Sequence, residues 1–267
     1  MTNKKENFEE FAKNFAKKAG KIMLKNFQLG MKKEWKKDNS PVTETDLKIN
    51  SLLIEEVKRN FPGQSVLAEE ESFMLEKSDY IWVCDPVDGT FPFSHGIPVA
   101  TFSLALVKNG EPIIGVVLDP FEGRLFFASK GKGSFLNGKK IHVSNKKSFS
   151  NIIGECEVWI NSKYNVNDLF LEFIKMDAKI TKFISFVYPT ALVAAGEYDF
   201  SVFPHSTCHD VAAVKIIVEE AGGKTTDIFG NEQRYDREIN GFIASNGVLH
   251  DKLVELSKKF VKVNSNE

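Results

Sequence analysis

Residues 81–90 constrain this chain more than any other stretch: an apolar run, two aspartates around a Pro-Val pair, then a glycine and a threonine. The apolar run follows a charged segment and predicts a buried strand. Pro86 fixes its own φ and has no N–H to donate, so we expect the strand to end there in a sharp turn. Asp85 and Asp88 would then lie close together at that turn.

Two carboxylates held together at a half-buried turn repel each other unless a cation lies between them. Sites rich in carboxylate oxygens suit hard divalent ions such as Mg²⁺. Gly89 would let the backbone approach a ligand closely, and the amides that follow would hold a phosphate. An ordinary surface turn also favours Asp-Pro and Asp-Gly pairs, so this stretch alone leaves both interpretations open.

The composition fits a soluble globular protein with one large domain or two closely packed lobes. The chain has 267 residues, 42% of them hydrophobic and 27% charged, with a formal net charge of −1. This charge gives no electrostatic argument for nucleic acid or an anionic membrane as a partner. There is no apolar run of membrane-spanning length, no signal-peptide pattern and no paired framework of cysteines. We therefore expect a cytoplasmic protein.

The first half of the chain predicts an α+β lobe. Apolar residues at helical spacing predict a helix over residues 7–27. Residues 28–39 are polar and lysine-rich, which favours a solvated loop in which a lysine would help to attract an anionic substrate. Extended segments separated by Asn-Gly and other glycine turns predict an antiparallel meander over residues 100–107, 113–118, 125–128 and 141–143.

Two acidic segments in this half have both a structural and a functional interpretation. Thr43 followed by Asp46 is typical of a helix N-terminus with a capping box, and the helix would end at Pro62. Asp46 is then a capping acid. Residues 69–71 are three glutamates after a short apolar run, which is most often a solvated loop. Glu69 would equally complete the acid pair of residues 81–90.

The second half alternates helices with short strands. The pattern predicts a helix over residues 189–196, a strand over 200–203 and a final helix over 249–260. Residues 207–210 would open another helix that ends at a pair of glycines. Asp210 lies three residues after a threonine, so a capping role applies to it as well. Neither a repeat nor a low-complexity linker separates the halves, so we expect the two lobes to share one core.

Four separated blocks occur in the order found in one known family: residues 40–46, 69–70, 85–90 and 209–223. Together with Asp227, Gly230 and residues 245–247, they span the chain nearly from end to end. On these blocks the chain resembles the inositol monophosphatase family of Mg²⁺-dependent, lithium-sensitive phosphomonoesterases.

The resemblance implies a layered αβαβα sandwich. An N-terminal α+β lobe, residues 1–147, would carry most metal ligands, and a C-terminal α/β lobe, residues 148–267, would supply Asp210 and the leaving-group pocket. We expect a homodimer. Two or three Mg²⁺ would be held by carboxylates and one backbone carbonyl: Glu69, Asp85, Val87, Asp88 and Asp210. Asp46 and Thr90, together with Glu69, would activate the attacking water.

The amides of Gly89 and Thr90 would hold the phosphate. Phosphate-monoester hydrolysis depends mainly on positioning and charge neutralisation, which agrees with such an acid-rich site. The side chains that would contact the leaving group are Phe203, His205 and His209.

Several positions depart from the family pattern. Phe203 stands where the name-giving members have a glutamate that binds inositol hydroxyls, and His209 replaces a tryptophan. Pro92 removes an amide just after the phosphate-binding turn, and the glycine step expected near Ser185 is missing. His205, His209 and Cys208 also raise the possibility of a zinc site, although their spacing is not typical of one. The metal chemistry is thus predicted to be intact and leaving-group recognition to be changed.

The primary hypothesis is Mg²⁺-dependent hydrolysis of a small phosphorylated metabolite. Alternatives in the same class are a sugar (bis)phosphatase, a histidinol-phosphate phosphatase and a nucleotide 3′-phosphatase. A non-catalytic binding or regulatory protein that keeps the fold is the alternative from a different class. Retention of the complete acid set favours the enzyme.

Overall fold

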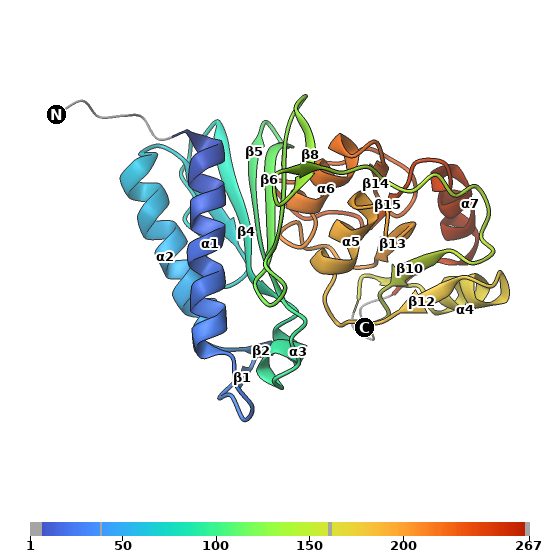
Figure 1. Ribbon diagram of the computed structural model, residues 1–267, viewed down its shortest axis with the longest axis horizontal. Coiled ribbons are helices and arrows are strands. Elements are labelled where there is room, and N and C mark those ends of the chain that lie inside the picture. Colours follow the sequence, from blue (N-terminus) through green and yellow to red (C-terminus); the bar gives the residue numbers. More distant parts are fainter. Residues whose placement is uncertain (1–6, 38, 160–161, 265–267) are drawn as a thin grey trace.

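The computed structural model describes residues 7–37, 39–159 and 162–264, and its elements form alternating layers of helix and sheet (Figure 1). A helix pair covers one face of a large sheet, a second helix pair lies between this sheet and a smaller one, and further helices cover the far side. Three clusters of buried apolar side chains fill the spaces between these layers. The arrangement confirms the predicted αβαβα sandwich.

The first helix layer consists of α1 (Phe8–Asn26) and α2 (Glu44–Asn60), as the apolar spacing predicts. In α2 the predicted capping box is present: Thr43 caps the helix and the Asp46 side chain accepts from the Thr43 amide at 3.0 Å. Ile49 and Leu53 on the inner face are completely buried against the large sheet. These contacts fix the N-terminus of α2, and with it Asp46, over the sheet.

The large sheet has seven strands in the order β3-β4-β5-β6-β7-β8-β9. The predicted meander runs from β5 onward, with antiparallel pairing, while β3 pairs with β4 in parallel. The strand bounds are Ser65–Ala68, Tyr80–Asp88, Thr101–Lys108, Glu111–Asp119, Arg124–Ser129, Gly133–Leu136 and Lys139–Lys140.

The strand expected over residues 141–143 is wrong. The meander ends at β9, and the Val143 amide donates to the Ala221 carbonyl at 3.1 Å instead of to a neighbouring strand. This segment passes from the large sheet toward α6, so its alternating apolar residues serve packing between layers.

The expectation that β4 ends at Pro86 is also wrong. The strand continues to Asp88, and its pairing with β5 changes register between Asp85 and Asp88. A bulge of this kind tolerates a proline because the ladder is interrupted where the missing N–H would be needed. The bulge places both aspartates at the same end of the strand.

The central helix layer consists of α5 (Val187–Ala194) and α6 (Ala212–Glu220). The packing of α6 on the large sheet is close at Gly115, where an added Cβ would lie 2.5 Å from the Ala213 carbonyl oxygen. Residues 207–210 do not open the helix as predicted; they form a turn before it, and Asp210 lies in that turn. Instead of a capping box, the Thr207 hydroxyl donates to the Asp210 carboxylate.

The small sheet has the strand order β12-β10-β13-β15-β14 and is covered on its far side by α4 (Asn167–Lys175) and α7 (His250–Phe260). Its strand bounds are Ile153–Cys156 for β10, Lys179–Thr181 for β12, Phe200–Phe203 for β13, Lys224–Thr226 for β14 and Phe242–Ser245 for β15.

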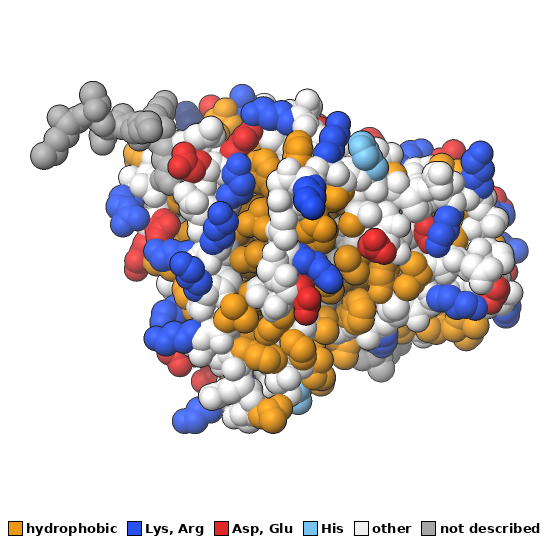
Figure 2. Space-filling view, viewed as in Figure 1, with side chains coloured by type: hydrophobic (Ala, Val, Ile, Leu, Met, Phe, Trp, Pro, Cys, Tyr) orange, Lys and Arg blue, Asp and Glu red, His pale blue; other side chains and the backbone are white. Residues whose placement is uncertain are grey.

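Short elements complete the chain. The residues expected to form a plain polar loop contain β1 (Glu34–Trp35), which pairs with β2 (Pro41–Val42). The helix α3 (Thr90–Ser94) follows β4, and β11 (Tyr164–Asn165) pairs with β16 (Lys262–Val263). Figure 2 shows apolar side chains gathered in the middle of one face. Among the described residues, no helix is long and apolar enough to cross a bilayer.

Candidate active site

One cavity of about 210 Å³ lies where the end of β4, the start of α3 and the turn before α6 meet. It is lined by every residue predicted to bind metal or substrate: Glu69, Asp85, Val87, Asp88, Gly89, Thr90, Phe203, His205, His209 and Asp210. The segments that meet here lie far apart in the sequence, and the layered packing brings them together.

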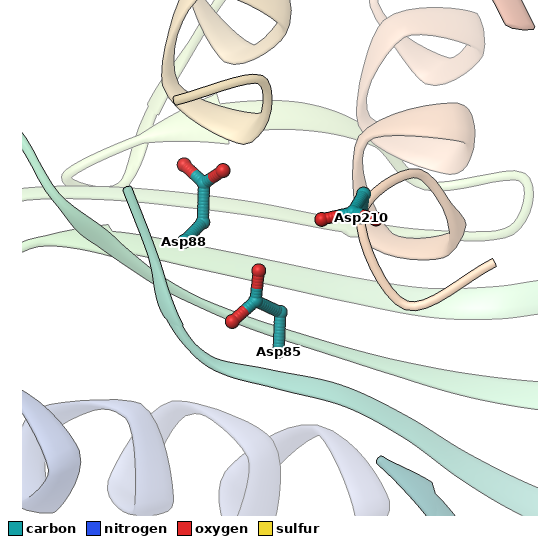
Figure 3. Close-up of side chains that lie close together, drawn as sticks. All are labelled: Asp85, Asp88 and Asp210. Atoms are coloured by element: carbon teal, nitrogen blue, oxygen red, sulfur yellow. The ribbon is translucent and has the colours of Figure 1, made fainter. Parts of the chain in front are cut away.

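Three carboxylates converge in this cavity. One carboxylate oxygen each from Asp85, Asp88 and Asp210 lies within 4.8 Å of the others, and Figure 3 shows the three groups facing a common space. Asp85 and Asp88 come from the bulged end of β4, and Asp210 from the turn before α6. Side chains from two layers thus form one cluster.

The electrostatics of this cluster favour a bound cation. Burial raises the pKa of Asp88 to about 6, with the nearby Asp210 carboxylate adding to the rise. Burial, then Glu69 and Asp210, raise the pKa of Asp85 well above its ordinary value. Like charges in a buried site are stabilised by a positive ion, and a purely carboxylate set suits Mg²⁺ better than zinc.

The zinc ligands considered from the sequence do not join this cluster. Neither His205, His209 nor Cys208 belongs to a group of three convergent metal-ligating side chains in the part of the chain that the structure describes. His209 instead lies beside the cluster, with Nε2 3.5 Å from Asp210 Oδ2. The residues present therefore fit a hard, oxygen-seeking ion.

Asp88 is held in place by three donors. Its Oδ2 accepts from Thr101 Oγ1 at 3.0 Å and from the Ser185 hydroxyl, and its Oδ1 accepts from the Phe186 amide at 2.9 Å. Ile184, just before Ser185, has φ of +56°, which is unusual for a β-branched residue. The strained turn aims Ser185 at the carboxylate, a role that the sequence did not suggest.

Glu69 lines the cavity but stands apart from the three converging aspartates. Its Oε1 accepts from Lys36 Nζ at 2.8 Å, and the same lysine donates to Glu70 Oε1 at 2.5 Å. Burial by itself lowers the pKa of Lys36, but the two carboxylates outweigh it and the pKa lies above its ordinary value. Lys36 belongs to the lysine-rich stretch in which a lysine was expected to help attract an anion; it does not line the cavity but contacts Glu69, which does.

Thr90 and Asp46 form a buried pair beside the cluster. Thr90 Oγ1 lies 2.9 Å from Asp46 Oδ1 and 2.8 Å from the Val87 carbonyl oxygen. Burial raises the pKa of Asp46 to about 7, and the negative charge of Glu69 adds to this although the Thr43 and Thr90 hydrogen bonds oppose it. A carboxyl that titrates near neutrality next to a hydroxyl is suited to proton transfer.

Gly89 occupies a position that only glycine fits. Its φ is +80°, and an added Cβ would lie 2.9 Å from the Val99 carbonyl oxygen and 3.0 Å from Ser185 Cβ. Both the left-handed backbone and the close contacts exclude a side chain. The turn from β4 into α3 can therefore face the cavity with its backbone.

The wall away from the aspartates is largely aromatic. Phe203 is buried between Phe186 and His205. The centroid of its ring lies 4.4 Å from that of Phe186 and 5.0 Å from that of His205. Glu157 and Trp159, which received no role from the sequence, also line the cavity. Glu157 follows β10 directly, and no local pattern in the sequence indicates that it lies at a cavity.

Comparisons with known proteins agree with this geometry. The family model for the inositol monophosphatase family matches residues 4–262. A curated relative from Thermotoga maritima, named fructose-1,6-bisphosphatase/inositol-1-monophosphatase, is 37% identical and covers 83% of this chain and 84% of its own. A histidinol-phosphatase from Chlorobaculum parvum is 31% identical and covers 92% of this chain and 94% of its own.

The fold comparison gives the same result. The solved structure of a Thermotoga maritima IMPase has a TM-score of 0.84 and 33% identity, and the match covers 94% of this chain and 96% of that chain. The sequence and structure matches both extend over nearly the whole chain, so they include both sheets and the cavity between them. The chain therefore belongs to the inositol monophosphatase family and is a phosphatase.

Proposed function

We propose that this phosphatase hydrolyses a small phosphate monoester in a Mg²⁺-dependent reaction. The observation that carries the proposal is the group formed by Asp85, Asp88 and Asp210, whose oxygens lie within 4.8 Å of one another beside the Thr90–Asp46 pair. Two or three Mg²⁺ would be held by these aspartates together with Glu69 and the Val87 carbonyl. When bound, Mg²⁺ supplies charge neutralisation at the phosphate and lowers the pKa of water.

Thr90 and Asp46 would position and deprotonate the attacking water. The Thr90 hydroxyl has one hydrogen, so when it donates to Asp46 its lone pairs are available to accept from the water. The water oxygen bonds to phosphorus, its proton passes toward Asp46, and the ester P–O bond breaks. The leaving alkoxide takes up a proton from solvent and Asp46 returns its own to solvent, so that inorganic phosphate and the alcohol are released. A pKa of about 7 on Asp46 suits this proton acceptance at neutral pH.

The backbone at Gly89 and Thr90 would hold the phosphate. Both residues line the cavity next to the aspartates, and Gly89 has no side chain to keep an anion at a distance. Phosphate oxygens are commonly bound by successive backbone amides in turns of this kind. Positioning the phosphate there would place its phosphorus between the acid cluster and the Thr90 hydroxyl.

Leaving-group recognition would differ from that of an inositol monophosphatase. The relatives' names already span fructose bisphosphate, inositol phosphate and histidinol phosphate. Phe203 offers no acceptor to a polyol, and each unmatched hydroxyl reduces selectivity. We therefore propose that inositol monophosphate is not the preferred substrate.

The test is kcat/KM for inositol, sugar, histidinol and nucleotide phosphates at one Mg²⁺ concentration. A less hydroxylated or differently shaped ester is expected to exceed inositol monophosphate, and Phe203→Glu should raise the inositol rate. Highest activity on inositol monophosphate, with no gain from Phe203→Glu, would contradict this part of the proposal.

The lobe boundary at residues 147 and 148, the homodimer and the cytoplasmic location stay predictions. The apolar side chains in the middle of the face in Figure 2 support a surface for self-association. Sedimentation of the purified protein across a concentration series tests the homodimer.

A further inference from the structure

Among the described residues that line the cavity, Glu157 is the one carboxylate besides the three clustered aspartates and Glu69, which contacts Lys36. It follows β10 directly, and its amide donates to the Val202 carbonyl at 3.0 Å, which extends the pairing of β10 with β13. Its side chain is only 15% exposed, and Oε2 is buried with no hydrogen-bond partner among the described residues. The sheet therefore holds a carboxylate oxygen at the cavity wall without satisfying it.

The surroundings of this oxygen compensate its charge only in part. No lysine or arginine of the described residues lines the cavity, and the imidazole of His205, which does, has its Nε2 4.0 Å from Oε2. Burial raises the pKa of Glu157, and the charges of Asp210 and Asp88 add to the rise, while the charge of Lys182 outside the cavity lining opposes it. A buried carboxylate without a donor is costly, so a ligand that brings a donor or a positive charge is favoured here.

The neighbouring side chains select the kind of group that would bind. Trp159, Phe186 and Phe203 give the wall beside Glu157 an aromatic surface, which attracts an organic cation. The hydroxyls of Ser185 and Thr207 already donate to Asp88 and Asp210. A polyol would find few matching groups on this wall, whereas one ammonium group would meet both a carboxylate and aromatic faces.

We infer that Glu157 determines specificity by binding an ammonium group on the leaving alcohol, so that the preferred substrates are phosphate esters of amino alcohols. This inference rests on the proposed phosphatase reaction and adds the class of its substrate. The Glu157 carboxylate belongs to the residue that follows β10. The position compared with the inositol-binding glutamate is Phe203, which lies on β13.

The experiment compares phenylalaninol phosphate with phenylpropyl phosphate, which differ only in the amino group. Wild type, Glu157→Gln and the control Glu155→Gln are assayed at equal Mg²⁺. Glu155 lies two residues earlier, within β10, and is buried, but it accepts from Thr181 Oγ1 at 2.8 Å and does not line the cavity. Loss of a charged hydrogen-bond partner should cost Glu157→Gln about ten- to a hundredfold in kcat/KM for the amino ester.

The expected result is a wild-type preference for the amino ester that Glu157→Gln abolishes and Glu155→Gln retains. Equal kcat/KM for the two esters in wild type would overturn the inference, and this holds even if Glu157→Gln fails to fold. An equal loss on both esters with a raised Mg²⁺ requirement would also overturn it, because Glu157 would then serve the metal. Hydrolysis of neither these esters nor the wider panel would instead refute the proposed reaction itself.

Discussion

Thr90 Oγ1 and Asp46 Oδ1 lie 2.9 Å apart, although 44 residues separate them in the chain. Asp46 is at the same time the capping acid of α2, with its other oxygen accepting from the Thr43 amide. One carboxylate therefore both completes a helix terminus and orients a hydroxyl at the cavity. The structural and functional interpretations of Asp46 are compatible.

Substitutions at this pair should separate the two roles. Thr90→Ala and Asp46→Asn are expected to lower kcat by orders of magnitude, because the water loses its orienting hydroxyl or its proton acceptor. The cap itself contributes only about 1 kcal/mol to stability. The measurements are kcat and the thermal midpoint of each variant.

The control for this pair is a cap far from the cavity. Asn7 caps α1, and its Oδ1 accepts from the Glu9 amide at 3.0 Å. Asn7→Ala should lose a similar amount of stability with unchanged kcat. If Thr90→Ala behaved like Asn7→Ala in both measurements, the catalytic role of the pair would be wrong.

Asp88→Asn should abolish the thermal stabilisation that Mg²⁺ gives the protein. A ligand at a hundredfold excess over its dissociation constant stabilises the folded state by about 2.7 kcal/mol. The substitution removes a ligand charge while keeping the size of the side chain, so we expect a folded variant whose melting temperature does not respond to Mg²⁺.

Asp119→Asn is the matched control for the metal site. Asp119 is also buried, and it accepts from the Phe121 amide at 2.9 Å, but it does not line the cavity. This variant should melt lower and still respond to Mg²⁺ like wild type. A normal Mg²⁺ response in Asp88→Asn would show that Asp88 is not a ligand.

Gly89→Ala should be far more damaging than Gly63→Ala. Both glycines have positive φ, +80° and +100°, but only Gly89 lacks room for a Cβ, whereas nothing lies within 4 Å at Gly63. The backbone strain common to both costs roughly 1 kcal/mol. The additional clash with Val99 and Ser185 should show as a larger loss of stability and of activity, and equal effects would contradict the packing described at Gly89.

Buried His250 should make stability depend on pH below neutrality. Its ring nitrogens lie 2.9 Å from Ser245 Oγ and 3.0 Å from Thr226 Oγ1, and burial together with the Lys224 charge lowers its pKa from 6.5 to about 4. The unfolded chain then binds a proton that the folded protein excludes.

The contribution of neutral His250 to folding stability is therefore fully present above pH 6.5 and is lost progressively as the pH falls toward 4. The loss is on the order of 3 kcal/mol. The measurement is the free energy of unfolding of wild type and of His250→Gln at each pH. The difference between the two proteins isolates the effect of His250 from that of the buried carboxylates, which change stability with pH in the opposite direction. A pH-independent difference between the two proteins would refute it.

Helices and strands with a strongly periodic apolar pattern were predictable from the sequence. Features set by contacts with other parts of the chain, such as strand register and where a helix begins, were not. The helix α1 and the strand β5 lie where the apolar spacing places them. The continuation of β4 through Pro86 depends on a bulge against β5, and local propensity cannot reveal the register of a partner strand. The helix expected at Thr207 begins later because the turn carrying Asp210 comes first.

The candidate site divides in the same way. The aspartates belong to local motifs and were identified by them. Ser185 reaches Asp88 across 97 residues of sequence, and nothing near it distinguishes it from a surface serine. Glu157 was missed because only the pairing of β10 with β13 shows that its carboxylate is buried at a cavity. Such contacts require the tertiary fold.

The most direct test of the account is phosphate release from a panel of small phosphate esters by the purified protein. It is measured with Mg²⁺, after EDTA treatment and after Mg²⁺ is restored. The account predicts turnover with Mg²⁺, loss of turnover with EDTA and recovery on restoration, because the converging Asp85, Asp88 and Asp210 carboxylates need a cation to act. Turnover that persists unchanged in EDTA, or its absence on every ester with Mg²⁺ present, would contradict it.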